Sequence, residues 1–138
     1  MAYDSAKIRY YELAVDYGAG ANTLQHIIGP KGKAGLLWDY GCHSVTEAFA
    51  GNSTTPQISV GTVADADAYG NEFDYGALAV AGGGKSIRTT YAETDDGWAT
   101  YMVNRNIPKD TVVMVTHIAA TGTPTGMATG FVAIIWED

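Results

Sequence analysis

Two short runs of branched and apolar residues in the last third of the chain constrain its fold most. The first run is TVVMVTHI at 111–118, and the second is FVAIIW at 131–136. A turn precedes the first run, and a loop rich in Gly, Pro and Thr separates the two. Branched side chains fit a pleated, packed sheet better than a crowded helical turn. The pattern therefore predicts two buried β-strands that close a sandwich.

The preceding residues predict further strands separated by turns. Tyr11, Leu13, Val15 and Tyr17 alternate with polar or small residues, as is typical of a strand with one buried face. Other strands are expected at 24–28, 35–45, 57–63, 76–81, 86–91 and 98–103. Helical signals are confined to a turn at 64–70 and to 44–49, and both segments are too short to form stable helices alone.

These elements indicate one all-β domain spanning residues 1–138. About eight strands with turns every dozen residues predict a β-sandwich wound as a jelly roll, although immunoglobulin-like topologies share the same local pattern. Ile8 and Tyr10 lie out of phase with the alternation that begins at Tyr11. This break predicts either a separate contact arm at 1–8 or a β-bulge at Tyr10 and Tyr11.

Charge and composition disfavour several classes of protein. The formal net charge is −7, and the eight Lys and Arg residues are spread along the sequence, which disfavours nucleic-acid binding. No apolar run is long enough to span a membrane. The first residues lack a basic stretch followed by an apolar core, so synthesis in a cytoplasm without export is expected. Cys42 is the only cysteine, and we expect it to be a small buried residue.

Two glycine- or aspartate-containing stretches match known binding loops only in part. The segment GGGKS at 82–86 ends like a phosphate-binding loop, but Ala79 stands where the first glycine is required and a strand is expected where the motif needs a helix. The segment 65–70 begins like a calcium loop, but Tyr69 replaces a ligand and Gly76 replaces the bidentate glutamate. We expect a hairpin turn and a solvated loop, respectively.

Titratable residues form no recognisable catalytic or metal-binding pattern. No two histidines have the His-x-His spacing of a cupin-type metal site, and Cys42 and His43 are neighbours that point to opposite faces of a strand. Three carboxylates near one turn are expected to be solvated rather than a glycosidase pair. The sequence thus predicts no catalytic residue, no metal and no cofactor. The side chains considered are His26, His43, His117, Glu93, Asp95 and Asp96.

Aromatic residues are abundant, with nine tyrosines and three tryptophans. Such side chains serve in a core, stack on sugars or form protein interfaces. Trp38 and Trp136 lie in expected strands and are predicted to be mostly buried. Tyrosines beside turns are predicted to be more accessible, namely Tyr3, Tyr17, Tyr69 and Tyr75.

The segments GPKGKAGLLWDY at 29–40, VTEAF at 45–49 and VGTVADADAY at 60–69, with the closing strands at 107–136, resemble jelly-roll head decoration (cement) proteins of tailed bacteriophages. This resemblance implies a non-enzymatic virion protein on the capsid surface, made in the host cytoplasm. It would form a homotrimer, bind the major capsid protein and stabilise the head. The alternative is a carbohydrate- or receptor-binding sandwich of a phage fibre or tail tip. An enzyme is a third class, which no residue spacing favours.

Overall fold

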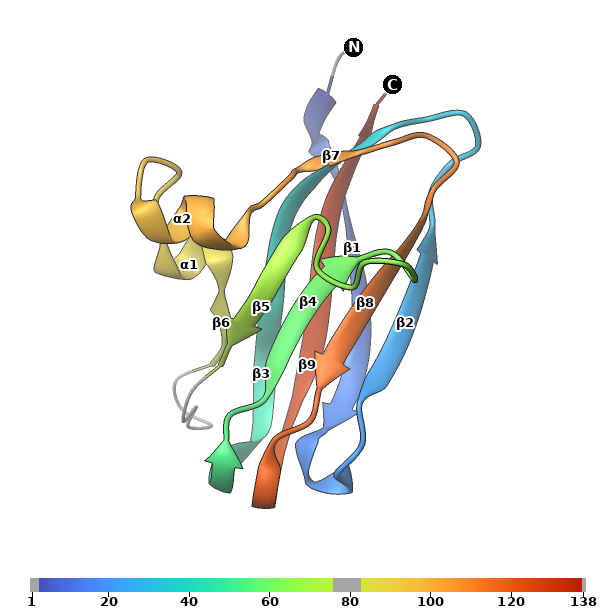
Figure 1. Cartoon of the computed structure of the whole chain (residues 1–138). Helices are drawn as coiled ribbons and strands as arrows, with labels where there is room; N and C mark the ends of the chain where they lie inside the picture. The colour runs from blue at the N-terminus through green and yellow to red at the C-terminus, as the bar shows by residue number, and fades with distance from the viewer. Residues whose placement is uncertain (1–2, 76–82, 138) are drawn as a thin grey trace.

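The computed structural model describes residues 3–75 and 83–137, which consist mainly of antiparallel strands (Figure 1). The all-β class is therefore confirmed. In the described ranges, one 3-10 turn and two short α-helices accompany the strands. The strands are β1 (Tyr3–Asp16), β2 (Thr23–Ile28), β3 (Gly35–Thr54), β4 (Gln57–Gly61), β5 (Gly70–Asp74), β6 (Lys85–Ser86), β7 (Asn106–Ile107), β8 (Val112–Ile118) and β9 (Thr121–Glu137). The helical elements are η1 (Tyr17–Ala19), α1 (Ile87–Thr90) and α2 (Asp96–Tyr101).

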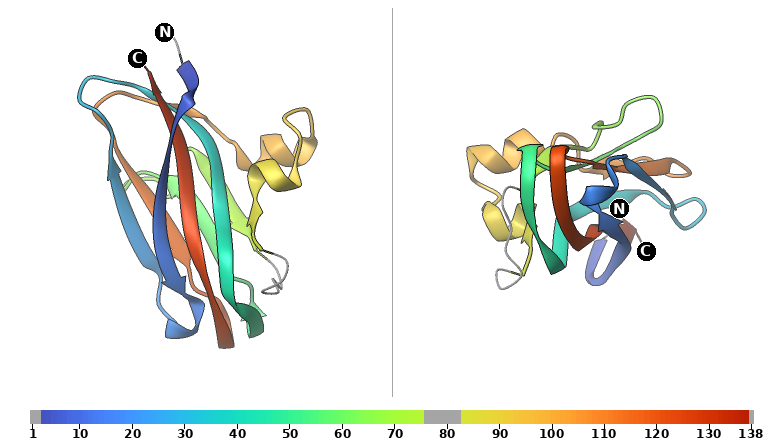
Figure 2. Two further views of the ribbon diagram at one scale, coloured as in Figure 1. Left: turned by 180° about the vertical axis from the view of Figure 1, so that it is seen from behind. Right: turned by 90° about the horizontal axis from the view of Figure 1, so that it is seen from below.

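The strands form two sheets that pack face to face. One sheet has the order β1-β9-β3-β6, with β7 also paired to β3, and the other has the order β2-β8-β4-β5. Figure 2 shows the first sheet from behind, with β9 between β1 and β3. The pairs are nested, because β4 pairs with β5, β3 with β6 and β7, β2 with β8, and β1 with β9. This nesting is the winding of a jelly roll, as predicted.

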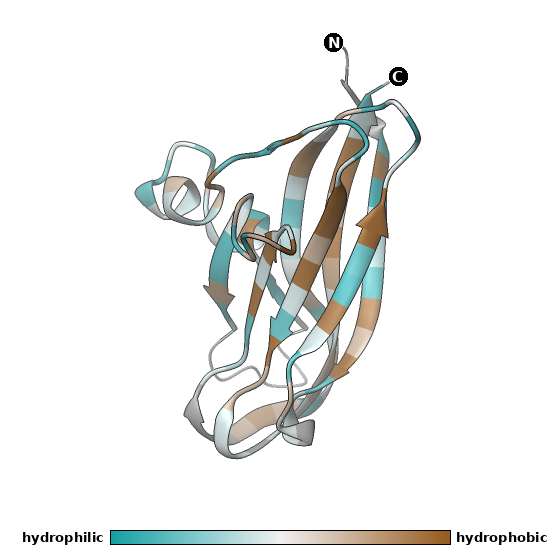
Figure 3. Cartoon of the chain, turned by 45° about the vertical axis from the view of Figure 1, so that its right-hand side comes forward, coloured by the Kyte–Doolittle hydropathy of each residue, from teal (hydrophilic) through white to brown (hydrophobic). Residues whose placement is uncertain are grey.

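The two branched runs at 111–118 and 131–136 form the middle of the sandwich. The first lies in β8 and the second in β9, and each of these strands has a partner on both sides. Val113, Val115, Val132 and Ile134 are fully buried. Hydrophobic and hydrophilic residues alternate in bands along the strands (Figure 3), because successive side chains point to opposite faces of a sheet.

Strand β1 confirms the alternation that begins at Tyr11. It also excludes one of the two explanations for the change of phase before Tyr11. Leu13 and Val15 face the core, whereas Tyr10 is 58% exposed on the outer face. Pairing with β9 is continuous from Ile8 to Asp16, so the predicted bulge at Tyr10 and Tyr11 is wrong. The register shifts instead between Tyr3 and Ile8, and Tyr3 still pairs with Glu137. Residues 3–8 therefore continue β1 along the end of β9.

Two segments predicted as strands, 86–91 and 98–103, form helices α1 and α2 instead. Ser86 begins α1 with a capping box, in which its hydroxyl accepts a bond from the Thr89 N–H and the Thr89 hydroxyl accepts one from the Ser86 N–H. In α2, the buried Trp98 side chain packs into the core cluster. Local capping and tertiary packing override the strand preference of these residues.

Other expectations about elements are settled by the fold. Segment 44–49 lies inside β3, so its helical signal was wrong. Segment 64–70 is a non-helical turn closed by the Ala68 N–H bond to the Asp65 carbonyl, before β5 begins at Gly70. The strand predicted at 76–81 lies outside the described residues. None of the described helices is long and apolar enough to cross a membrane.

Most tyrosines predicted to be accessible are in the core. Tyr17, Tyr69 and Tyr75 are buried, so these predictions are wrong. Tyr17 and Tyr75 pack against each other with ring centroids 5.7 Å apart, and both rings contact Phe49. Residues beside turns can thus point inward when the sandwich closes over them. The side chain of Tyr3 lies outside the part of the chain described.

Candidate functional site

The histidines and cysteine considered in the sequence lie apart. His26 is exposed on β2, His117 is buried on β8, and His43 lies partly exposed on β3, 3.5 Å from the Glu12 carboxylate. Cys42 is buried as predicted. Within residues 3–75 and 83–137, no group of three or more His, Cys, Asp or Glu side chains is placed to hold a metal ion.

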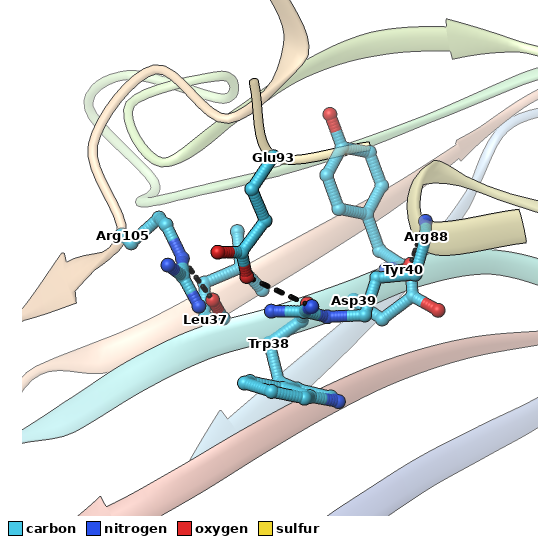
Figure 4. Close-up of polar contacts among 7 residues, drawn as sticks. All are labelled: Leu37, Trp38, Asp39, Tyr40, Arg88, Glu93 and Arg105. Atoms are coloured by element: carbon cyan, nitrogen blue, oxygen red, sulfur yellow. Dashed lines mark hydrogen bonds and ion pairs between the residues drawn. The ribbon is translucent and has the colours of Figure 1, made fainter. Parts of the chain in front are cut away.

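A cluster of polar contacts surrounds Trp38 on β3 (Figure 4). A β-bulge places Trp38 there, because Leu37 pairs with Ile134 and Asp39 pairs with Ala133, leaving Trp38 as the extra residue. Leu37 and Tyr40 are therefore both fully buried. The bulge explains why apolar bulk occurs on both alternating sets of residues in this strand. Trp38, predicted to be mostly buried, is partly exposed and covered by an arginine.

Two arginines pack on Trp38, one from α1 and one from the residue directly before β7. The Arg88 guanidinium carbon lies 3.2 Å from the Trp38 ring centroid, and Arg105 lies 5.9 Å from it. Arg88 Nε donates to the Trp38 carbonyl at 2.6 Å, and Arg105 Nε donates to the Leu37 carbonyl at 2.9 Å. Glu93 pairs with Arg88 at 2.9 Å. Burial lowers the pKa of Arg105, and the nearby positive charge of Arg88 is a second, smaller cause.

Asp39 joins this cluster to the start of α1. Its carboxylate accepts bonds from the Ser86 hydroxyl at 2.8 Å and from the Arg88 N–H at 3.1 Å. Burial raises the pKa of Asp39, and these bonds act in the opposite direction. Arg88 Nη2 and Arg105 Nη2 have no hydrogen-bond partner among the described residues, but both guanidinium groups also lie over the Trp98 ring of α2, at 4.8 and 5.4 Å. The cluster thus holds α1 and α2 against β3. We interpret it as a structural clamp, not as a catalytic site.

The motif-like loops also have structural roles. A helix does follow Ser86, so the helix argument against a phosphate-binding loop was wrong, but α1 has only four residues and Ala79 remains in place of the first glycine. Asp65 and Asp67 are exposed in the turn after β4, as predicted for a solvated loop. A hydrogen bond with Asp65 is the main cause that raises the pKa of Asp67.

The predicted carboxylate turn is also solvated. Glu93, Asp95 and Asp96 are all exposed, as expected. Asp95 accepts a bond from the Ala92 N–H at 2.8 Å, which shapes the turn before α2. Glu93 faces Arg88 rather than another carboxylate. The turn therefore holds helix α2 in place and does not bring a pair of acids together.

A groove opens beside the clamp on the outer face of the β1-β9-β3 sheet. Three rings from three neighbouring strands line it, with centroids 5.9 Å apart for Tyr10 and Phe131 and 5.6 Å apart for Phe131 and His43. Polar side chains of Ser86 and Thr89 form its opposite wall, and its volume is about 300 Å³. We call it the aromatic groove. An exposed ring beside hydroxyl groups suits a ligand with both apolar and polar faces.

A second surface lies on the outer face of the other sheet. Leu24 and Ile28 on β2 are 54% and 79% exposed, and Val112, the β8 partner of Ile28, is 42% exposed. His26 lies between Leu24 and Ile28 on the same face. Strand β2 is at the edge of its sheet. We call these four residues the β2–β8 face.

Sequence reasoning missed both surfaces for different reasons. The period-two pattern already placed Tyr10 opposite to Tyr11, which was the available signal for its exposure. Leu24 and Ile28 carried no comparable signal, because exposure of an apolar residue depends on which strand is its neighbour.

A scan against models of protein families, a search of curated proteins and a search of solved structures found no match to the chain.

Proposed function

We propose that the protein is a non-enzymatic component of a phage particle, a head decoration protein that self-associates as a homotrimer and binds the major capsid protein. The β2–β8 face is the observation that carries this proposal. Apolar side chains on an edge strand favour contact with another protein surface, because covering them removes apolar area from water. The jelly-roll winding agrees with the resemblance of segments 29–40 and 60–69 to such proteins.

Self-association is tested by the native mass of the purified protein, measured by light scattering coupled to gel filtration. A trimer should form, and Ile28→Asp should dissociate it, because the new carboxylate would be buried without a partner. Val103→Asp is the matched control, since Val103 is 57% exposed away from the β2–β8 face. A monomeric parent protein, or equal behaviour of both variants, would contradict self-association through this face.

Capsid attachment is tested separately by cosedimentation with phage heads prepared without the protein. The parent protein should sediment with the heads, and an excess of unlabelled protein should displace it. Failure to sediment at concentrations at which the trimer is intact would refute the decoration role while leaving self-association standing.

The aromatic groove favours a second candidate function, carbohydrate binding by a fibre or tail-tip component. Tyr10 provides an exposed ring on which a sugar can stack, with the partly exposed His43 and the exposed Thr89 also lining the groove. Tyr69 and Tyr75 are unsuitable as platforms because they are buried. Binding to a glycan array that is lost in Tyr10→Ala and kept in Tyr91→Ala would favour this function. No bound glycan would argue against it.

A further inference from the structure

Cations that are distant in the sequence gather at one end of the sandwich. Figure 1 shows both termini, the loop between β2 and β3 and the loop between β7 and β8 at this end. Lys7 and Arg9 on β1 face Lys33 of the β2–β3 loop across a groove. Lys31 and Lys109 flank a contact between the two loops, the Gly32 N–H bond to the Asp110 carboxylate. Five of the eight Lys and Arg residues thus lie at one end of the sandwich, although they are spread along the sequence.

The described carboxylates beside this groove are held by backbone donors. Asp110 accepts the bond from the Gly32 N–H at 2.8 Å, and Glu137 accepts one from the Ala34 N–H at 2.7 Å. The Glu137 N–H in turn donates to the Ala34 carbonyl at 3.0 Å. Both acids therefore fix the β2–β3 loop in position. Among the described residues that line the groove, three are basic (Lys7, Arg9 and Lys33) and one, Glu137, is acidic, and its carboxylate already accepts a backbone bond.

The groove has a fixed apolar floor. Trp136 is buried at its base and donates from Nε1 to the Tyr11 hydroxyl at 2.8 Å. Gly29 and Gly35 lie against the Trp136 ring, and a Cβ at either position would lie within 2.7 Å of it. The loop that carries Lys33 is thus seated directly on the ring. The groove has a volume of about 460 Å³, which is within the range of small-ligand sites.

We propose that this groove, which we call the basic groove, binds a short acidic segment of a partner protein. Carboxylates of the segment would meet Arg9 and Lys33 on the rim, and an apolar side chain would lie over Ile8 and Trp136. A long polyanion such as DNA fits less well, because the chain as a whole carries a net charge of −7 and repels it beyond the groove. This inference goes beyond the proposed self-association, which uses the β2–β8 face.

The test measures fluorescence anisotropy of a labelled peptide of eight residues, six Glu or Asp and two Leu, at low salt. The double variant Arg9→Gln/Lys33→Gln should bind about tenfold more weakly than the parent protein, since two exposed ion pairs are removed. Lys85→Gln removes one charge far from the groove and should bind as the parent does, with folding of each variant checked by circular dichroism. A peptide with Gln and Asn in place of the acids should bind much more weakly.

Several results would overturn the proposal. Absence of peptide binding, equal binding of the neutral peptide, or an unchanged affinity of the double variant would each exclude an acidic segment in the basic groove. Tighter binding of a short single-stranded DNA would assign the cations to a nucleic acid instead. The same titration with Ile28→Asp separates the two surfaces, because that variant should keep peptide binding whether or not the parent protein forms a trimer.

Discussion

Lowering the pH should destabilise the fold through His117. This side chain is 2% exposed and lies between the sheets, next to Gly130 of β9. Neither ring nitrogen has a hydrogen-bond partner among the described residues. Burial lowers the pKa of His117 from 6.5 to about 4, because the protonated ring would carry its charge into the interior of the sandwich, where no described acceptor bonds to it. The folded chain therefore holds His117 neutral where the unfolded chain protonates it.

The direction and size of the stability change follow from the pKa values of His117 in the unfolded and folded states. Between pH 6.5 and 4 the unfolded state binds the extra proton, so stability is present above about pH 6.5 and is lost as the pH falls. A difference of about 2.5 pKa units corresponds to roughly 3 kcal/mol when the loss is complete, and to about 2 kcal/mol at pH 5.

The assay is urea unfolding followed by tryptophan fluorescence between about pH 8 and pH 4.5. His117→Leu should unfold with a free energy that depends less steeply on pH, and the difference between the two slopes isolates His117 from the carboxylates. At about pH 8 the variant should be at least as stable as the parent protein, because it removes two unsatisfied nitrogens. His26→Leu is the matched control, since the ring of His26 is exposed in the single chain, and all variants are compared in the Ile28→Asp background so that the β2–β8 face stays uncovered.

One outcome would refute this reasoning. If His117→Leu retains the full pH slope of the parent protein, the acid sensitivity arises elsewhere and the ring is accommodated as a cation.

Three further predictions concern packing and reactivity. Gly130→Ala would place a Cβ 2.3 Å from His117 Cε1, and should cost about 1–3 kcal/mol in urea unfolding, recovered in part by adding His117→Ala. Arg88→Lys should lose the stacking on Trp38 and should raise the rate of amide hydrogen exchange in α1, while the rate in β8 stays unchanged as a reference. An α1 exchange rate equal to that of the parent protein would contradict the clamp. Burial raises the pKa of Cys42 to about 11, so a disulfide reagent at about pH 8 should modify the native thiol roughly a hundredfold more slowly than the unfolded one, and equal rates would show that the thiol is accessible.

The sequence predicted strands correctly where the buried residues lie within one segment of the chain. The alternation at Tyr11, Leu13 and Val15 indicates a strand with one buried face, and the unbroken apolar runs in β8 and β9 indicate inner strands that are buried on both faces. Segments 86–91 and 98–103 carried the same residue types and formed helices. These segments are helical because of a capping box and because Trp98 packs into the core cluster. The strand propensities of single residues contain no information about either.

The candidate surfaces were harder to predict because they depend on neighbours in space. The cations of the basic groove belong to β1 and to two loops that meet only when the sandwich is wound. Trp38 became a platform through a bulge, which shifts every later residue of β3 relative to β9. Burial of Tyr17 and Tyr75 likewise follows from rings contributed by other strands. A local pattern contains none of this information.

The central positions of β8 and β9 have a consequence for biosynthesis. Each sheet has one of its inner strands supplied by residues 112–137, so β1, β2, β3 and β4 emerge from the ribosome before the strands that join them. Pairing of Tyr3 with Glu137 spans almost the whole chain. Such remote contacts slow folding, and unpaired strands invite association. The sandwich should thus be completed only once β9 has left the ribosome, and chaperones that bind exposed strands should influence its yield.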